Sequence, residues 1–230
     1  MQKRTLVLTA MEEELKPFLQ KAEINSEEER LNIKIWQGSL GGKEVIFVLT
    51  GIGKVNAALA IQNLFNLYPI DHVFNVGVAG GIADKVTLGD VCFANQVIQS
   101  DFDVTCLGYE KGHIPRMPTS VFEAVAKQKI LEEMKEKIKY NLHLGRIISA
   151  DQFVTDRAVV LKLGQEFNAI AKDMESAAIG HACYLNNTPF TIIRGISDSS
   201  GKDAEQEYEN NLALAVNNSI DAFIKYFKLI

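Results

Sequence analysis

Two hydrophobic patterns alternate along the chain. Short apolar runs predict buried strands at residues 5–10, 33–39, 43–50, 72–81, 145–150 and 189–195, with extended backbone also at 88–100. Apolar residues spaced three and four apart predict helices at residues 11–22, 53–66, 120–139, 174–187 and 203–230. Strands that alternate with helices in this way indicate an α/β fold.

Glycines interrupt this pattern at two places. Gly41 and Gly42 separate two predicted strands and indicate a hairpin, so the sheet should be mixed rather than wholly parallel. The strand at 72–81 is expected to end in a turn of small residues, GVAGG. No linker, repeat or low-complexity segment divides the chain, which predicts one domain over residues 1–230.

Composition and charge narrow the function classes. Of the 230 residues, 47% are hydrophobic and 23% charged, and the formal net charge of −5 with no basic stripe argues against a nucleic-acid partner. Cys92, Cys106 and Cys183 are scattered, which suits a reducing compartment and argues against disulfides or a metal site. The first strand leaves no room for a signal peptide, and no apolar run approaches the length of a membrane span. We therefore expect a cytoplasmic protein without a membrane partner.

The stretch TGIGKVNA, residues 50–57, invites comparison with phosphate-binding loops. A P-loop requires glycine at position 48 and Ser or Thr at position 55, but both positions are Val. Asn56 occupies the third glycine position of a dinucleotide fingerprint. Neither motif is therefore complete, and no cofactor is expected.

Acidic residues follow several predicted strands. Glu14 ends an acidic run after the first strand, Glu175 lies near the start of a helix, and Asp198 follows the strand at 189–195. In an α/β sheet, segments that leave the carboxyl ends of strands converge on one crevice. Carboxylates that meet there suit hydrolysis of a glycosidic bond, because one can protonate the leaving group while another activates water.

Each of these acids also has a structural interpretation. The acids at 12–14 would suit the first turn of a helix. Asp173 could cap the next helix, with Glu175 in its first turn. Asp198 could be a loop acid paired with Arg194. The patterns alone leave both interpretations open.

Seven motifs occur in the order and spacing of one enzyme family: AMEEE, GIGKVNAALA, NVGVAGGI, DFDVTCLGYEKGHIP, SADQF, DMESAAIGHAC and RGISD. Together, from about residue 5 to the terminal helix, they resemble the 5′-methylthioadenosine/S-adenosylhomocysteine nucleosidases of the purine nucleoside phosphorylase superfamily. The resemblance implies a three-layer α/β/α fold with a central mixed, mostly parallel twisted sheet. It also implies hydrolysis of these nucleosides, with release of adenine and no cofactor.

The resemblance implies catalytic roles for two of the acids. Asp198 is similar to the general acid that protonates N7 of adenine, and Glu14 to the base that activates water. Because Asp198 would have to keep its proton near neutral pH, its surroundings should raise its pKa. Arg194 and Ser197 are similar to groups that position the water and the acid.

Other residues are implied in substrate binding. Glu175 would accept hydrogen bonds from the ribose hydroxyls, and Met174 would pack against the ribose. Phe153 would stack on adenine, whose edge the backbone of Val154 would read. Gly80, in the small-residue segment, is the fifth of these substrate residues.

Residues 104–115 resemble a loop that covers the 5′ substituent bound in a neighbouring subunit. The apolar pocket for a methylthio group would then be lined by Val104, Leu107, Tyr109, Pro115, Met11, Ile52 and Tyr208. Apolar residues on a loop need cover, and the resemblance implies that a homodimer supplies it.

Four positions depart from the family pattern. Asp173 stands where bacterial members usually have Glu, and Asp-Met-Glu is similar to the plant branch, whose members can favour methylthioadenosine. Val78 stands where many members have a small hydroxyl residue, which implies the loss of a water contact. Leu107 and Tyr208 replace positions often filled by Phe, which changes the shape of the 5′ pocket.

Three other functions fit part of the pattern. A nucleoside phosphorylase needs a cationic phosphate pocket, but the first segment carries three glutamates and Asn75 brings no charge. A futalosine or 6-amino-6-deoxyfutalosine nucleosidase must accept a polar 5′ group, which Leu107, Ile52 and Met11 disfavour. A purine-binding module without catalysis would lack one of the acids, yet Glu14 and Asp198 are both present.

Overall fold

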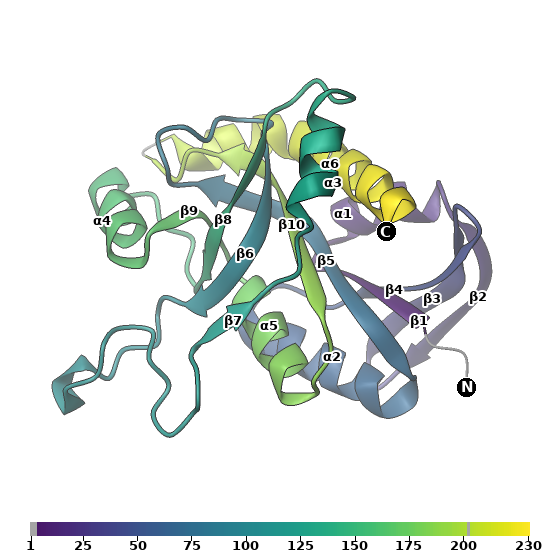
Figure 1. Ribbon diagram of the computed structural model, residues 1–230, viewed down its shortest axis with the longest axis horizontal. Helices are drawn as coiled ribbons and strands as arrows, with labels where there is room; N and C mark the ends of the chain where they lie inside the picture. Colours follow the sequence, from purple (N-terminus) through teal and green to yellow (C-terminus); the bar gives the residue numbers. More distant parts are fainter. Residues whose placement is uncertain (1–3, 202) are drawn as a thin grey trace.

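The computed structural model describes residues 4–201 and 203–230, in which helices cover both faces of a sheet (Figure 1). The strands are β1 (Arg4–Thr9), β2 (Glu23–Arg30), β3 (Ile33–Leu40), β4 (Lys43–Leu49), β5 (Ile70–Gly81), β6 (Val91–Gln99), β7 (Val121–Glu123), β8 (Leu142–Ser149), β9 (Ala169–Asp173) and β10 (Phe190–Asp198). The helices are α1 (Glu12–Leu19), α2 (Lys54–Leu67), the short 3-10 helix η1 (Thr105–Leu107), α3 (Gln128–Lys135), α4 (Arg157–Phe167), α5 (Ser176–Leu185) and α6 (Ala204–Leu229). The predicted alternation of strands and helices is confirmed.

The sheet is mixed, as the glycine hairpin predicted. β4, β1, β5 and β10 run parallel to one another, while β3 and β2 continue antiparallel beyond β4. β6, β8 and β9 form a second parallel group, joined antiparallel to β10 at one end and to β5 at the other. Because β5 pairs with both β9 and β10, the strands β5, β9, β8, β6 and β10 close into a ring. This ring brings the ends of β5, β9 and β10 together.

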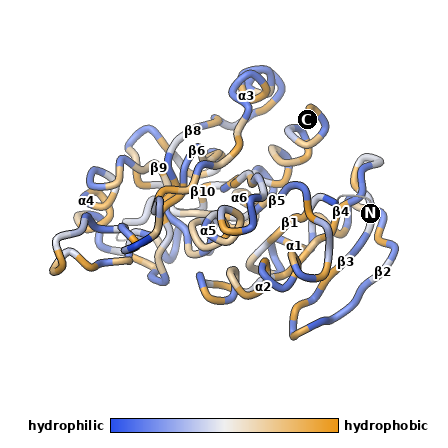
Figure 2. Tube along the Cα trace, turned by 60° about the horizontal axis from the view of Figure 1, so that its bottom comes forward, coloured by the Kyte–Doolittle hydropathy of each residue, from blue (hydrophilic) through white to orange (hydrophobic). Residues whose placement is uncertain are grey.

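Two apolar layers attach the helices to the sheet. On one face α2 and α5 pack through a cluster that includes Ile61, Leu64 and Ile179. On the other face α1, α3 and α6 pack through a cluster that includes Phe18 and Phe223. This is the expected three-layer arrangement. The outer strand β2 is hydrophilic along much of its length (Figure 2) and is largely exposed, which is why its sequence gives no buried-strand pattern.

The small residues of GVAGG do not form a turn, and that prediction was wrong. β5 continues through them to Gly81. A side-chain carbon at Gly77 would lie 2.4 Å from Glu14 Oε1, and one at Gly80 would lie 2.0 Å from Ser200 Oγ. These glycines therefore allow neighbouring side chains to approach the strand closely. A run of small residues looks the same in the sequence whether it allows such an approach or forms a turn.

The predicted helix at 120–139 was wrong in its first part. Val121–Glu123 pair with β6 as β7, which buries Phe122, and α3 begins only at Gln128. The expected ion pair between Glu133 and Lys137 forms, with an N–O distance of 2.7 Å. The sequence patterns also missed four elements, namely β2, η1, α4 and β9.

Candidate active site

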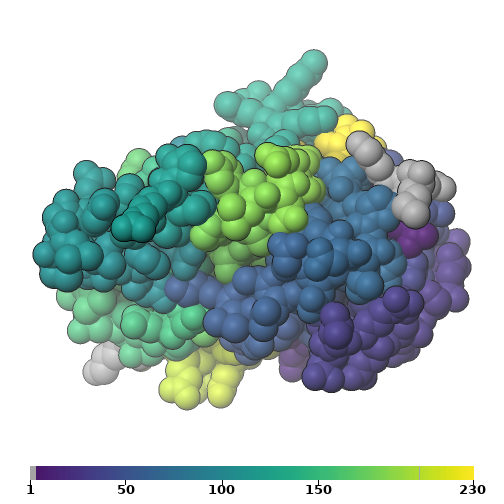
Figure 3. Space-filling model, turned by 90° about the horizontal axis from the view of Figure 1, so that it is seen from below, coloured from purple at the N-terminus to yellow at the C-terminus, as the bar shows by residue number. Residues whose placement is uncertain are grey.

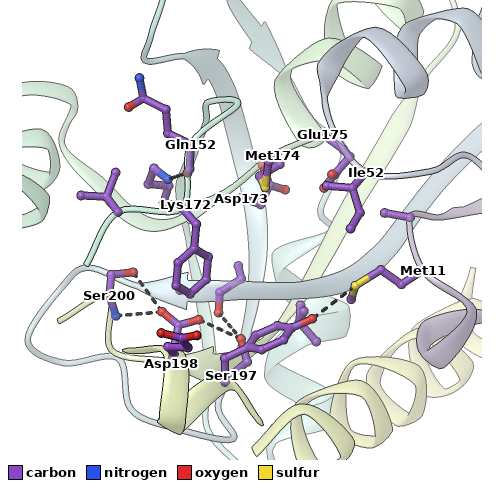
Figure 4. A pocket seen from close by; sticks show the side chains of 18 of the residues that line it. Met11, Ile52, Gln152, Lys172, Asp173, Met174, Glu175, Ser197, Asp198 and Ser200 are labelled. Atoms are coloured by element: carbon purple, nitrogen blue, oxygen red, sulfur yellow. Dashed lines mark hydrogen bonds between the residues drawn. The ribbon is translucent and has the colours of Figure 1, made fainter. Parts of the chain in front are cut away.

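A cavity of about 590 Å³ opens where β1, β5, β9 and β10 end (Figure 4). Segments from four strands converge on it, as expected for the carboxyl ends of strands in an α/β sheet. The residues predicted from sequence that line it are Met11, Glu14, Ile52, Gly80, Phe153, Val154, Met174, Glu175, Ser197, Asp198 and Tyr208. The fold thus brings together eleven residues from widely separated segments of the chain.

Glu14 lies in the first turn of α1 and is held by backbone donors. Its Oε2 accepts hydrogen bonds from the amides of Ala10 and Met11 at 2.9 and 3.1 Å, and its Oε1 accepts one from Val78 at 3.0 Å. Only 4% of Glu14 is exposed. Burial raises the pKa of Glu14, while the nearby Arg194 and the three amides oppose the rise. Glu14 therefore fits both interpretations of the sequence, because it lies in the first turn of a helix and its carboxyl lines the cavity.

Asp198 is the last residue of β10 rather than a loop residue, and 3% of it is exposed. Its Oδ1 accepts a hydrogen bond from the Ser200 amide at 2.9 Å, and its Oδ2 accepts one from the Ser197 hydroxyl at 3.0 Å. Burial raises the pKa of Asp198, and the bonds from the two serines oppose the rise. A raised pKa is the direction expected for a carboxyl that donates a proton near neutral pH.

Arg194 pairs with Asp173 and not with Asp198, so the alternative pairing considered from sequence was wrong. Its Nε donates to Asp173 Oδ2 at 2.7 Å, and both side chains are almost wholly buried. Its guanidinium also donates to Asn75 and to Ser176 Oγ. Asp173 in turn accepts a hydrogen bond from the Ser176 amide at 3.3 Å, but the N-cap of α5 is Glu175, so the expectation that Asp173 is the N-cap with Glu175 in the first turn was wrong. Arg194 does not line the cavity itself and lies behind it.

Glu175 precedes the first turn of α5, and its side chain reaches the loop before α2. Its Oε1 accepts a hydrogen bond from the Gly53 amide at 2.8 Å. Burial, and after it the charge of Asp173, raise the pKa of Glu175 to about 7 against the opposing effects of Arg194 and the Gly53 amide. The glycine-rich segment that fails as a phosphate loop therefore positions a carboxylate instead.

The cavity has two chemically different ends (Figure 4). At one end lie Met11, Ile52 and Tyr208, and the Tyr208 hydroxyl contacts Met11 Sδ at 3.3 Å. We call this the apolar end. At the other end, which we call the polar end, lie Asp198, Ser200, Lys172 and Gln152.

Residues 104–115 do not reach the cavity of their own chain. Val104, Leu107, Tyr109 and Pro115 are absent from its lining within the described residues. Leu107 is 69% exposed and Tyr109 is 40% exposed. A role for this loop in a neighbouring subunit stays a prediction.

Val78 and Asp173, which the sequence showed as departures from the family pattern, also line the cavity. The structure adds lining residues that the sequence patterns did not single out, namely Ala10, Ala79, Gln152, Lys172, Ser200, Glu205 and Glu209. Two of them had a usable signal, since Lys172 directly precedes the Asp-Met-Glu motif and Ser200 lies two residues after Asp198. Among the lining residues that the structure describes, Lys172 is the single cation.

Two negative findings concern residues 4–201 and 203–230. No group of three or more His, Cys, Asp and Glu side chains is arranged there to hold a metal ion. No helix in this part of the chain is both long enough and apolar enough to span a membrane.

The fold and the cavity together define an α/β protein with a carboxyl-lined site of small-molecule size. The chain belongs to the phosphorylase superfamily, whose family model matches residues 4–228. This confirms the superfamily inferred from the motifs.

Individual proteins of known name are similar to this chain along nearly its whole length. The chain is 37% identical over 217 residues to a 5′-methylthioadenosine/S-adenosylhomocysteine nucleosidase from Geobacillus sp. (strain WCH70), covering 94% of each chain. It is also similar to the nucleosidase of the same name from Neisseria meningitidis, solved in complex with methylthio-immucillin-A, with a TM-score of 0.92, 30% identity and full coverage of both chains. Futalosine hydrolase of Helicobacter pylori strain 26695 has the same TM-score, with 25% identity and coverage of 99% and 98%.

Proposed function

We propose that this protein is an N-glycosyl hydrolase that cleaves 5′-methylthioadenosine and S-adenosylhomocysteine and releases adenine. The observation that carries the proposal is the pair of buried carboxyls, Glu14 and Asp198, which line one cavity and both have raised pKa values. Relatives of known name support the substrate, since the Geobacillus and Neisseria proteins are nucleosidases for these two compounds. We take residues 1–230 to form a single catalytic domain.

In the proposed reaction Asp198 donates its proton to N7 of adenine. The C1′–N9 bond then breaks and its electron pair leaves with the base. Glu14 takes a proton from water, whose oxygen forms the new bond to C1′. The negative charges of Glu14 and Glu175 stabilise the oxocarbenium-like sugar, so they act more strongly in the transition state than in the ground state.

The other lining residues would orient the nucleoside. Phe153 stacks on adenine, the backbone of Val154 reads its edge, and the backbone of Gly80 lines the cavity beside it. Met174 packs against the ribose, while Glu175 accepts hydrogen bonds from its hydroxyls. Ser197 holds the carboxyl of Asp198, and Arg194 holds the Asp173 carboxylate behind the cavity while its charge acts on Glu14 and Glu175.

Water is the better nucleophile for this site than phosphate. The lining carries the acids Glu14, Asp173, Glu175, Asp198, Glu205 and Glu209. Among the described lining residues Lys172 is the single cation. A phosphate dianion would be repelled by these acids and would lack the arginine clamp that usually binds it.

Cleavage of futalosine or 6-amino-6-deoxyfutalosine is the second candidate, because a futalosine hydrolase is among the similar structures. Met11 and Ile52 favour a methylthio group over a polar 5′ group at the apolar end. The test is kcat/KM for purine release from 5′-methylthioadenosine, S-adenosylhomocysteine and the two futalosine compounds. We expect the highest value for 5′-methylthioadenosine. A higher value for either futalosine compound would reverse the order of the two candidates.

We further propose a cytoplasmic homodimer that acts in methionine salvage. One face of the molecule, formed by α2, α5 and the loop at 101–115 (Figure 3), carries exposed apolar side chains that include Val55, Leu59, Leu107 and Leu185. In the dimer, Val104, Leu107, Tyr109 and Pro115 of one subunit would cover the apolar end of the cavity in the other. Exposed apolar residues of this kind are typical of protein interfaces.

A further inference from the structure

A buried lysine from β9 lies at the polar end of the cavity. Lys172 is 8% exposed, and its ammonium donates a hydrogen bond to the carbonyl oxygen of Gln152, directly before Phe153 (Figure 4). A lysine ammonium carries three donors. Within the described residues this carbonyl is the one acceptor that it contacts, so two donors remain for a bound molecule.

The strand register places Lys172 beside the same glycine as Asp198. Gly80 of β5 is paired with Lys172 of β9 on one side and with Asp198 of β10 on the other. Residues paired directly across neighbouring strands project from the same face of the sheet. Gly80 has no side chain to separate Lys172 from Asp198, and Ser200 Oγ lies where such a side chain would begin.

A purely structural role does not account for this lysine. Burying an ammonium is costly unless it is paired, yet none of the ion pairs among the described residues includes Lys172. Burial lowers the pKa of Lys172, while the charges of Asp173, Asp198 and Asp101 favour its protonated form. A buried cation that lines a cavity next to an acid is a candidate functional group.

We propose that Lys172 is a catalytic residue that contacts the departing base, donating a hydrogen bond to an acceptor atom of the purine and stabilising the electron pair that the purine takes from the C1′–N9 bond. This inference rests on the proposed function. Asp198 supplies the proton to N7, whereas Lys172 transfers no proton and acts through its charge. In this arrangement Lys172 contacts the base from β9 and Asp198 contacts it from β10, the two strands that pair with β5.

The test compares Lys172→Met, which keeps the length and removes the charge, with Lys172→Arg, which keeps the charge. Lys162→Met, at an exposed position of α4, is the matched control. Steady-state kinetics with 5′-methylthioadenosine should show kcat lowered about 10- to 100-fold in Lys172→Met, the range for loss of a charged hydrogen bond. KM should change less, and Lys172→Arg should recover part of the loss.

The pH profile separates this role from a structural one. The groups that face Asp198 are Ser197, Ser200, Glu207 and Lys172. Loss of the lysine charge should raise the pKa of Asp198, so the alkaline limb of kcat/KM should move to higher pH in Lys172→Met. A kcat within twofold of wild type with an unmoved limb would overturn the inference while wild-type turnover upholds the proposed function.

Adenine binding, measured by calorimetry, tests the role of Lys172 even if the protein does not cleave the nucleoside. If the wild-type protein releases no adenine, the proposed function fails, and the comparison of adenine affinity then decides the role of Lys172. A loss of about tenfold or more in Lys172→Met supports contact with the base, and equal affinity contradicts it. If the melting temperature shows that Lys172→Met is unfolded, Lys172→Gln replaces it in all three measurements.

Discussion

The polar end and the apolar end of the cavity are built in different ways. Side chains at the polar end, such as Asp198 and Lys172, stand on paired strands, are buried and have hydrogen-bond partners. At the apolar end, Ile52 is 50% exposed, and the loop expected to cover this end lies elsewhere in its own chain. The residues proposed for the chemistry are therefore placed by the strand register of one chain, whereas the apolar end is partly open within that chain.

The largest effect is expected from neutralising the acid at the polar end. We expect Asp198→Asn to lower kcat by about 10²- to 10⁴-fold, since it removes the general acid. Substrate affinity should stay within a few fold, because the stacking and ribose contacts remain. The measurement is single-turnover adenine release beside equilibrium binding. Near-normal turnover would show that Asp198 is not the proton donor.

A second change addresses the apolar end through the loop. Leu107→Asp places a charge on the exposed face that we propose to be the dimer interface, so the protein should become monomeric in light scattering. Because each cavity would then lose its cover, kcat/KM for 5′-methylthioadenosine should fall by about 10-fold, within the usual cost of an interface truncation. A dimer with unchanged kinetics would remove residues 104–115 from the site. Val159→Asp, at an exposed position of α4, is the control.

A third prediction concerns stability at the ribose position. The pKa of Glu175 is raised to about 7 from a usual value of 4.5, so its contribution to stability is complete below about pH 4.5 and is lost as the pH rises through about 7. Glu175→Gln removes this buried charge and should stabilise the protein at pH 8 by about 1–2 kcal/mol. Denaturant unfolding at pH 8 and pH 4.5 checks this, and the gain should vanish at the lower pH. A less stable variant at pH 8 would mean that Arg194 fully compensates the charge.

The smallest expected effect comes from the hydroxyl that this chain places at its apolar end. Tyr208→Phe removes the contact with Met11 Sδ and leaves the ring in place. We expect kcat to stay unchanged and KM for 5′-methylthioadenosine to change by about two- to threefold. This is less than the roughly tenfold change that the loss of a strong neutral hydrogen bond would cause. A large fall in kcat would show that the two ends are coupled.

The fold was largely predictable because its elements carry clear apolar periods. β10 begins with an apolar run and α6 has an apolar period in its second half, whereas β2 is largely polar and β9 has only five residues. The strand β7 was missed because Val121–Glu123 take their conformation from pairing with β6. The apolar pattern of a short segment does not show whether that segment will pair with a strand that is distant in the sequence.

For the site, sequence reasoning identified residues that stand in motifs and missed those defined by register. Glu14, Glu175 and Asp198 lie in motifs, and the structure places all three in one cavity. Lys172 enters the cavity because it is paired with Gly80, and the partner of Arg194 proved to be Asp173. These relations depend on which strands become neighbours, and one sequence without its fold does not specify them.

Water is the nucleophile in the proposed reaction. The direct test is turnover of 5′-methylthioadenosine in water enriched in oxygen-18, with and without added phosphate, followed by mass analysis of the sugar product. We predict that adenine release needs no phosphate and that the heavy oxygen appears at C1 of free methylthioribose. Release that requires phosphate and yields the sugar 1-phosphate would contradict the account and make this chain a phosphorylase.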